Sequence, residues 1–168
     1  MPITSDQYRQ IMRRHPAAVT IISTGRAPER SGMTATAVMS LSAEPVRLVC
    51  AINRATLTFT HIERNGFFCV NTLSQEQTEL AKLFAGRDAR FGEERFCEEH
   101  WTTLESGAPV LRQAVMTLDC RLSQCIDMGT HALVIGDVVA GSVVATQPPL
   151  LYVDGQWAGV DTRLACAA

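Results

Sequence analysis

The sequence predicts a mainly β fold with peripheral helices, arranged as an antiparallel β-barrel with the helices packed at its ends. Strand-like runs outnumber helical ones, and most follow one another without the intervening helix that a parallel sheet requires. From Met116 to Ser123, apolar and polar residues alternate with a period of two, which is typical of a half-buried strand. The chain has no G-x-G-x-x-G and no G-x-x-x-x-G-K-S/T motif, which disfavours a doubly wound nucleotide-binding fold.

Length and composition favour one domain spanning residues 1–168. The chain has 168 residues and a formal net charge of −2. A chain of this length buries a core without support from metals or disulfides. Its mixed charges leave no basic footprint for nucleic acid. Because it lacks both an apolar run of about 18 residues and a leader-like N-terminus, we expect no membrane association and a cytoplasmic protein.

The cysteines and histidines do not follow a metal-binding spacing. Most of the cysteines lie in apolar runs and none belongs to a C-x-x-C pair, so we expect buried thiols and no metal site. These residues are Cys50, Cys69, Cys97, Cys120, Cys125 and Cys166, with His15, His61, His100 and His131.

Two helices are expected in the first part of the chain. Thr4 followed by Gln7 forms a capping box, which predicts a short helix ending before Pro16. Residues 56–65 are expected to form a second short helix. Strands are expected over residues 17–24, 46–53, 67–73, 116–123, 132–145 and 150–153, with the first of them central in the sheet or nearly so.

A third helix is expected after Ser74. Ser74 and Gln77 repeat the capping box, and an apolar stripe follows that ends at Gly86. The charged and aperiodic segment 87–101 is expected to be a solvated loop or a surface helix.

A row of hydroxyls marks the segment that begins at Gly32. Thr34, Thr36, Ser40 and Ser42 are spaced two, four and two residues apart, so on one extended chain they would share a face. They form either the exposed face of an antiparallel sheet or the lining of a groove for a planar heterocycle. From these residues alone both interpretations remain open.

His131 stands out among the histidines because it follows Gly129 and Thr130 between two β-patterned runs. We expect these three residues to form the turn of a hairpin, with the imidazole at its mouth. A single histidine is more often structural than functional, so the tripeptide alone is a weak signal.

Several short motifs, taken in order, resemble the short-chain flavin reductases. This family supplies reduced flavin to two-component monooxygenases and folds as a flavin-binding split barrel. The resemblance covers roughly Tyr8 to Tyr152. The motifs are Gly32 to Thr36, Ser40-Leu41-Ser42 with Pro45, Asn53-Arg54 followed by Thr56 and Thr58, Phe68 to Leu73, Leu83 to Gly86, Gly129-Thr130-His131, and Pro149 to Tyr152.

The resemblance implies one flavin reductase-like, FMN-binding domain over residues 1–168. It implies an NAD(P)H:flavin oxidoreductase that passes hydride from NADH or NADPH to FMN, or to FAD, for a partner monooxygenase. The flavin would lie at a homodimer interface, with His131 as the catalytic residue against the nicotinamide. The implied cofactor-binding residues are Thr34, Ala35, Thr36, Ser40, Leu41 and Ser42 at the ring, Asn53, Arg54, Thr56 and Thr58 at the phosphate, and Phe84, Gly86, Gly129, His131 and Tyr152.

Two other functions remain open from the sequence. One is a flavoprotein that keeps FMN bound and reduces another acceptor, such as a corrinoid cobalt. The other is a non-catalytic flavin- or heme-binding module with His61, His100 or His131 as ligand; the row of hydroxyls disfavours heme. The chain departs from the family pattern at Trp157 and in the tail to Ala168, so the acceptor specificity of relatives does not transfer.

Overall fold

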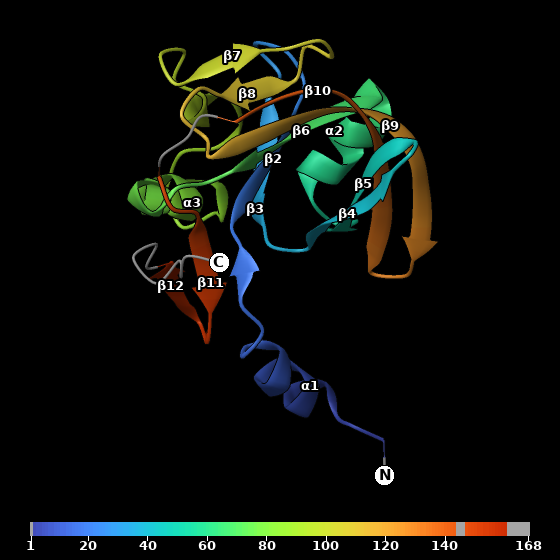
Figure 1. The fold of residues 1–168 in the computed structure, drawn as a ribbon, viewed down its shortest axis with the longest axis vertical. Helices are drawn as coiled ribbons and strands as arrows, with labels where there is room; N and C mark the ends of the chain where they lie inside the picture. Colours follow the sequence, from blue (N-terminus) through green and yellow to red (C-terminus); the bar gives the residue numbers. More distant parts are fainter. Residues whose placement is uncertain (1, 144–146, 161–168) are drawn as a thin grey trace, which may run out of the picture.

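A seven-stranded antiparallel sheet forms the centre of the protein in the computed structural model, which describes residues 2–143 and 147–160 (Figure 1). The strand order is β3-β2-β6-β9-β10-β5-β4. The strands are β2 (Thr20–Thr24), β3 (Ser31–Ala35), β4 (Val38–Ala43), β5 (Val46–Asn53), β6 (Phe67–Thr72), β9 (Met116–Met128) and β10 (His131–Val143). The predicted mainly β, antiparallel architecture is confirmed.

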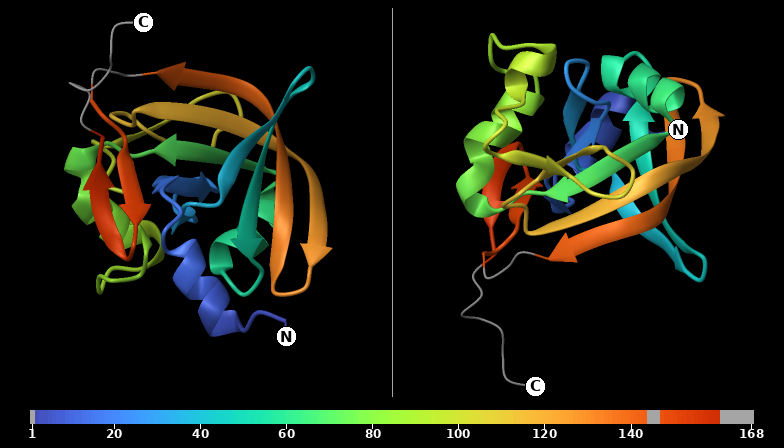
Figure 2. Two further views of the ribbon diagram at one scale, coloured as in Figure 1. Left: turned by 60° about the horizontal axis from the view of Figure 1, so that its bottom comes forward. Right: turned by 90° about the horizontal axis from the view of Figure 1, so that it is seen from above.

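The two edge strands of this sheet, β3 and β4, are consecutive in sequence and joined only by Thr36 and Ala37. The sheet therefore curls until its edges approach each other at this link, as both views of Figure 2 show. Ala51 N donates to Ala37 O at 2.9 Å, which fixes the link against β5. Because β3 and β4 are not paired with each other in the described residues, the barrel is split.

The hydroxyl-bearing segment is not one strand, so the expected shared face for its threonines and serines is wrong. Thr34 lies on β3 and Thr36 lies in the link. Ser40 and Ser42 lie on β4, with a register shift between them where Leu41 is inserted. A bulge of this kind re-aims the side chains on either side of it.

Two smaller sheets accompany the barrel. One has the order β1-β11-β12 and the other contains β7 and β8. The expected strand over 17–24 is divided at Val19 into β1 and β2. Strand β2 is the second strand of the large sheet, between the edge strand β3 and β6. The strand over 150–153 is confirmed, whereas β12 was not expected. Their bounds are β1 (Ala17–Ala18), β7 (Trp101–Thr103), β8 (Pro109–Leu111), β11 (Leu150–Val153) and β12 (Gln156–Gly159).

The first two helices begin where their capping residues predict, whereas the one expected after Ser74 begins as a 3₁₀ turn and becomes an α-helix only at Thr78. The helices are α1 (Ser5–Met12), α2 (Leu57–Asn65) and α3 (Thr78–Phe84), and the 3₁₀ turns are η1 (Gln75–Gln77) and η2 (Gly92–Arg95). Thr4 and Gln7 form the capping box of α1, and Thr56 caps α2 by accepting a hydrogen bond from Phe59 N. No helix in the described part of the chain is long and apolar enough to cross a membrane.

Helix α1 stands away from the barrel. Figure 1 shows it projecting beyond the strands, and none of its residues is buried. Its apolar side chains include Tyr8 and Ile11, which are 56% and 61% exposed. An amphipathic helix that is left without a partner in its own chain usually has one elsewhere.

Apolar side chains from the strands and from α2 fill the interior of the barrel. Residues of β5, β6, β9 and β10 pack on Phe59 and Ile62 of α2, which occupies the inside of the curl. Gly136 on β10 is required by close approach, because a Cβ there would lie 2.6 Å from Phe68 Cζ and 2.8 Å from Cys120 Cβ.

Cys50 and Cys120 belong to this interior, whereas Cys69 lies in a separate apolar cluster with Ala108 and Val110. Cys50, Cys69 and Cys120 are buried free thiols, whereas Cys125 is half-buried and Cys97 is exposed. Burial raises the pKa of Cys50 to about 12, so this thiol stays protonated and behaves as a small apolar side chain. Cys166 and the end of the expected strand 132–145 lie outside the described residues.

The polar face of β9 is covered, which the alternating pattern did not reveal. Thr117 and Asp119 are 1% and 0% exposed. Asp119 Oδ2 accepts a hydrogen bond from Ser106 N at 2.7 Å, and Oδ1 accepts one from the Ser106 hydroxyl. The loop between β7 and β8 is therefore fastened to the sheet through a buried carboxylate.

The charged segment 87–101 is also more than a solvated loop. Its exposed charges surround Phe96 and Trp101, each 4% exposed, which pack on Phe84 at ring-centroid distances of 5.1 and 5.6 Å. Arg30 pairs with Glu93 and fixes the segment against β3. Because Phe96 and Trp101 are buried in the core, this charged segment contributes to it.

Candidate functional site

His131 is the first residue of β10 and does not lie in the turn itself. The turn consists of Gly129 and Thr130, with Gly129 at φ 82°, a value that favours glycine. In the sheet, His131 pairs with Met128 on one side and with Asn53, the last residue of β5, on the other. Two of the expected site residues, far apart in sequence, thus become neighbours.

Arg54 fastens the end of β5 to this hairpin. Its backbone N donates to Thr130 O at 3.1 Å, and its Nη1 donates to Gly129 O at 3.3 Å. Nη1 also donates to Asp127 Oδ2 at 2.5 Å, in an ion pair whose side chains are 44% and 60% exposed. Nε and Nη2 have no hydrogen-bond partner among residues 2–143 and 147–160, so one edge of the guanidinium remains available.

The start of α2 lies directly beyond Arg54. Asn53 Oδ1 accepts a hydrogen bond from Ala55 N at 2.9 Å and orders the approach to the helix. The first two backbone N–H groups of the helix, at Leu57 and Thr58, have no partner in the part of the chain that the structure describes. The positive end of the helix dipole therefore lies three residues beyond Arg54 along the chain.

Thr58, unlike Leu57 before it, faces the interior. It is 3% exposed, and its hydroxyl lies 3.0 Å from the Ser31 hydroxyl on β3. Met33 Sδ, also on β3, lies 3.8 Å from the Thr56 hydroxyl. Thr58 thus ties α2 to β3, and the structure does not place it on the surface with Arg54.

Thr34 and Phe84 belong to the contact between β3 and α3. The Thr34 hydroxyl donates to Ala81 O at 2.7 Å. Phe84 is 3% exposed, and its ring would lie 2.9 Å from a Cβ placed on Gly32. Gly86, in the left-handed conformation, follows α3 on the surface. Ala35 is half-buried at the end of β3.

The triplet Ser40, Leu41 and Ser42 does not join His131 within one chain. Ser40 pairs with Leu48, which lies five residues from Asn53 along β5, or roughly 16 Å at strand spacing. The Ser42 hydroxyl donates to Pro45 O and stabilises the β4–β5 turn. These residues line a different end of the same sheet.

An apolar pocket of about 640 Å³ connects several of the remaining residues. It lies between α1 and the outer face of β4, β5 and β10. Because alternate residues of a strand share a face, Leu133 in this pocket continues the face that carries His131, just as Ala51 continues that of Asn53. Its lining includes Tyr8, Met12, Thr36, Met39, Leu133 and Tyr152. One exposed face therefore runs from His131 to Thr36 and Tyr152.

Sequence reasoning missed Asp127 and the apolar part of this face. Asp127 precedes Gly129 by two residues, the spacing of a side chain that caps its own turn, and Gly129 N donates to its Oδ1 at 2.7 Å. Met39 and Met128 are each 62% exposed. Their exposure could not be predicted, because apolar residues on either face of a strand recur at the same spacing of two.

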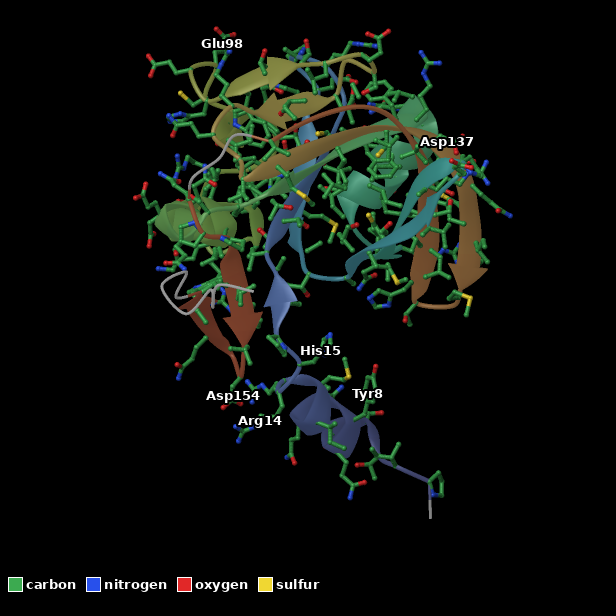
Figure 3. All side chains as sticks on the ribbon, viewed as in Figure 1. Tyr8, Arg14, His15, Glu98, Asp137 and Asp154 are labelled. Carbon is green, nitrogen blue, oxygen red and sulfur yellow. The ribbon has the colours of Figure 1, made fainter. Side chains whose placement is uncertain are left out.

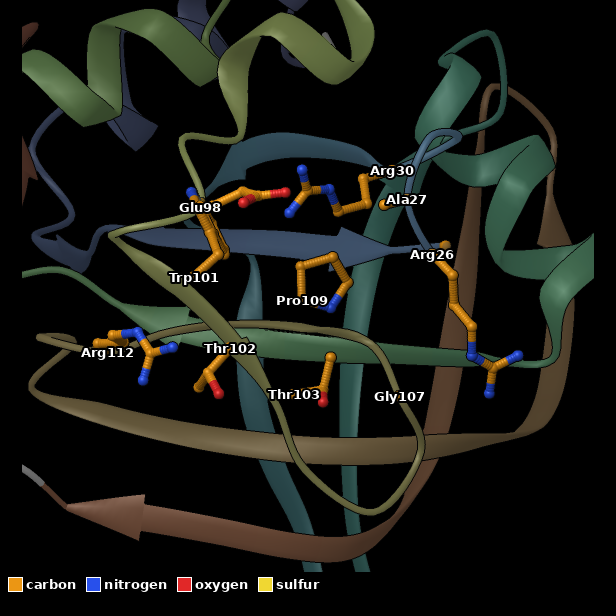
Figure 4. Close-up of a pocket in the computed structure, with 11 residues that line it drawn as sticks. Arg26, Ala27, Arg30, Glu98, Trp101, Thr102, Thr103, Gly107, Pro109 and Arg112 are labelled. Atoms are coloured by element: carbon orange, nitrogen blue, oxygen red, sulfur yellow. The ribbon is translucent and has the colours of Figure 1, made fainter.

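A second pocket, of about 530 Å³, lies between the Gly25–Arg30 loop and the β7–β8 region (Figure 4). It is lined by Arg26, Arg30, Glu98 and Arg112, and by none of the expected site residues. Figure 3 shows its Glu98 at the opposite end of the molecule from Tyr8, which lines the apolar pocket. Within the described ranges, no three His, Cys, Asp or Glu side chains gather as a metal site requires.

Comparisons with known proteins agree with this geometry. A family model described as "Flavin reductase like domain" matches residues 12–161. The chain is 40% identical over 145 residues to an FMN reductase (NADH) RutF of Agrobacterium fabrum, covering 86% of this chain and 82% of the relative.

Two solved structures share the fold over nearly the whole chain. Flavin reductase PheA2 superposes with a TM-score of 0.86 at 28% identity, covering 95% of this chain and 100% of that one. A nitrilotriacetate monooxygenase component B from Mycobacterium thermoresistibile does so with a TM-score of 0.88 at 25% identity, covering 97% and 90%. The chain, a split barrel with one exposed polar-to-apolar face, belongs to the flavin reductase-like family.

Proposed function

We propose that this protein is an NADH-dependent FMN reductase whose product, reduced FMN, serves a partner monooxygenase. The observation that carries the proposal is the exposed face on which His131, Asn53 and Arg54 meet at one end and apolar side chains follow. Relatives named FMN reductase (NADH), and a structural neighbour named as a monooxygenase component, support the choice of flavin, donor and partner. The whole chain, residues 1–168, would act as one FMN-binding domain.

The residues at the polar end fit the phosphate of FMN. A phosphate takes hydrogen bonds from a guanidinium edge and from backbone N–H groups at a helix N-terminus. Arg54 offers Nε and Nη2, and α2 offers the N–H group of its exposed first residue, Leu57. Asn53 and Thr56 hold these donors in place through the hydrogen bonds that cap the helix.

The apolar part of the face fits the flavin ring. A planar, largely apolar ring needs a surface with few placed polar groups, which Leu133, Ala51 and Thr36 provide. Bound FMN supplies a two-electron acceptor for the hydride of NADH. His131 would align the nicotinamide; its Nδ1 lies 3.0 Å from the Thr130 hydroxyl, which leaves Nε2 for the ligand. No proton transfer is required of it.

We further propose a homodimer in which a second copy completes the site. Within one chain, Ser40, Leu41 and Ser42 lie far from His131 along the sheet, so a ring contacted by both groups requires two copies. The exposed apolar residues on β4, β9 and α1 support burial of this face by a partner. These side chains are Met39, Leu41, Met128, Tyr8 and Ile11.

The function is tested by measuring NADH oxidation with FMN, with FAD and without added flavin. We expect rapid oxidation that requires added flavin and is faster with FMN. Protein that never consumes NADH in the presence of either flavin would contradict the proposal. Oxidation that needs no added flavin would instead identify a tightly bound flavin.

Met39→Glu is expected to convert the homodimer to a monomer. Met39 is 62% exposed, so glutamate is tolerated in the single chain, whereas a carboxylate buried in an interface without a partner is strongly unfavourable. Molar mass from light scattering during size-exclusion chromatography checks this result. Leu104→Glu, a change at an exposed position in the β7–β8 loop, is the control and should leave the mass unchanged. A Met39→Glu protein with the mass of the wild type would exclude this face as the interface.

A further inference from the structure

Asp127 has both carboxylate oxygens engaged at the polar end of the site. Oδ1 accepts a hydrogen bond from Gly129 N at 2.7 Å, which stabilises the β9–β10 turn. Oδ2 accepts one from Arg54 Nη1, which brings a negative charge into direct contact with the guanidinium. Asp127 thus links the turn before His131 to Arg54, the residue proposed to bind the phosphate.

The contact changes the electrostatics of Arg54 without blocking it. The carboxylate contacts Nη1, whereas Nε and Nη2 have no partner among the described residues. Asp127 is the only carboxylate within ion-pair distance of Arg54 in that part of the chain. An anion at the available edge therefore meets a guanidinium whose charge is already neutralised by a neighbour.

We infer that Asp127 determines how strongly this chain retains FMN, by neutralising the charge of Arg54 so that the flavin phosphate is held weakly. The inference rests on the proposed function and extends it to flavin exchange. A reductase whose product must leave for another enzyme needs a flavin that dissociates, and an ion pair at Nη1 lowers the affinity for phosphate while it leaves the Nε and Nη2 donors available.

The sign of the effect follows from the charges. The phosphate of FMN is attracted by Arg54 and repelled by Asp127, whereas riboflavin, which lacks the phosphate, is affected by neither. Because both side chains are about half exposed, solvent weakens the repulsion but does not abolish it.

The test is Asp127→Asn, with the dissociation constants of FMN and riboflavin measured by flavin fluorescence. Asparagine keeps the Oδ1 acceptor for Gly129 N, and its amide nitrogen, which cannot accept from Arg54 Nη1, replaces Oδ2, so the charge and the ion pair with Arg54 are both removed. We expect FMN to bind roughly threefold to tenfold more tightly, with riboflavin unchanged. The gain should shrink at high salt, because the effect is electrostatic. Asp127→Ser keeps a shorter acceptor in the turn and should change FMN affinity in the same direction.

The matched control is Asp137→Asn. Asp137 pairs with Arg47 at 2.6 Å across β10 and β5, at similar exposure, and the hydrogen bond from Arg47 holds the pKa of Asp137 below its ordinary value. Its removal changes the net charge equally, away from the phosphate subsite, and should leave both affinities unchanged.

Two results would overturn the inference. If both Asp127 variants kept the wild-type ratio of riboflavin to FMN affinity, Asp127 would have no effect at the phosphate. If FMN affinity fell while riboflavin binding held, the carboxylate would orient Arg54 instead of neutralising it. Failure of the proposed function gives a different result, because a wild-type protein without NADH oxidation would fail before any variant is made.

Discussion

Asp119→Ala is expected to lower the free energy of unfolding by about 3 kcal/mol. The carboxylate is 0% exposed and accepts hydrogen bonds from both the backbone N–H and the hydroxyl of Ser106. Alanine would leave these two donors inside the protein without an acceptor and would open a space beneath the β7–β8 loop. Ser106 also holds Ala108 N at 3.0 Å and, through its carbonyl, Arg26, so the loss extends along the loop.

Urea unfolding followed by circular dichroism measures this change. Wild type and variants are compared at one protein concentration, because association contributes to apparent stability. Asp119→Asn keeps an acceptor for Ser106 N and should cost about 1 kcal/mol. Ser106→Ala removes only the hydroxyl and should fall between wild type and Asp119→Ala. An alanine variant as stable as the wild type would show that the buried carboxylate does not fasten the loop.

The same residue shows where sequence reasoning stops. The alternation from Met116 to Ser123 correctly predicts a strand, because the period of two is a property of the strand itself. Whether water or protein covers the second face depends on the segment around Ser106, which has no periodic pattern. The strand was expected to be half-buried, yet Thr117 and Asp119 on its polar face are buried.

Features that depend on a few neighbouring residues were predictable. The capping box of Thr4, the hydrogen bond from Ser74 N to the Gln77 side chain and the left-handed Gly86 after α3 all involve contacts within about one turn of the chain. The division of the hydroxyl segment between β3 and β4 was not predictable. It depends on which edge of the sheet each half joins, and those partners lie elsewhere in the sequence.

The candidate site depends both on short motifs, which can be recognised in the sequence, and on contacts between distant strands, which cannot. Asn53, Arg54 and His131 were each selected from short motifs, and sheet register brings them together. Ser40, Leu41 and Ser42 came from the same kind of motif, yet one chain keeps them apart from His131. Their participation depends on a second copy, whose position no pattern in a single sequence specifies.

His131→Ala is expected to reduce kcat/KM for NADH by roughly tenfold to one hundredfold while FMN binding and stability stay unchanged. The imidazole is exposed at the start of β10, and its only side-chain hydrogen bond to residues 2–143 and 147–160 is with the Thr130 hydroxyl, so its removal leaves no buried group of these residues unsatisfied. Hydride transfer requires two rings in contact, and a side chain that holds the nicotinamide acts on the donor alone.

Pre-steady-state reduction of the FMN-loaded protein separates the two ways in which alignment can fail. Weaker binding of NADH raises the NADH concentration that gives half of the maximal rate of FMN reduction, whereas misalignment of bound NADH lowers the maximal rate itself. His131→Asn keeps a polar group at the site and should recover part of the loss, and His100→Ala, an exposed histidine before β7, should match the wild type. If His131→Ala reduces FMN at the wild-type rate at every NADH concentration, His131 does not contact the donor, and the nicotinamide must be held by residues elsewhere on this face.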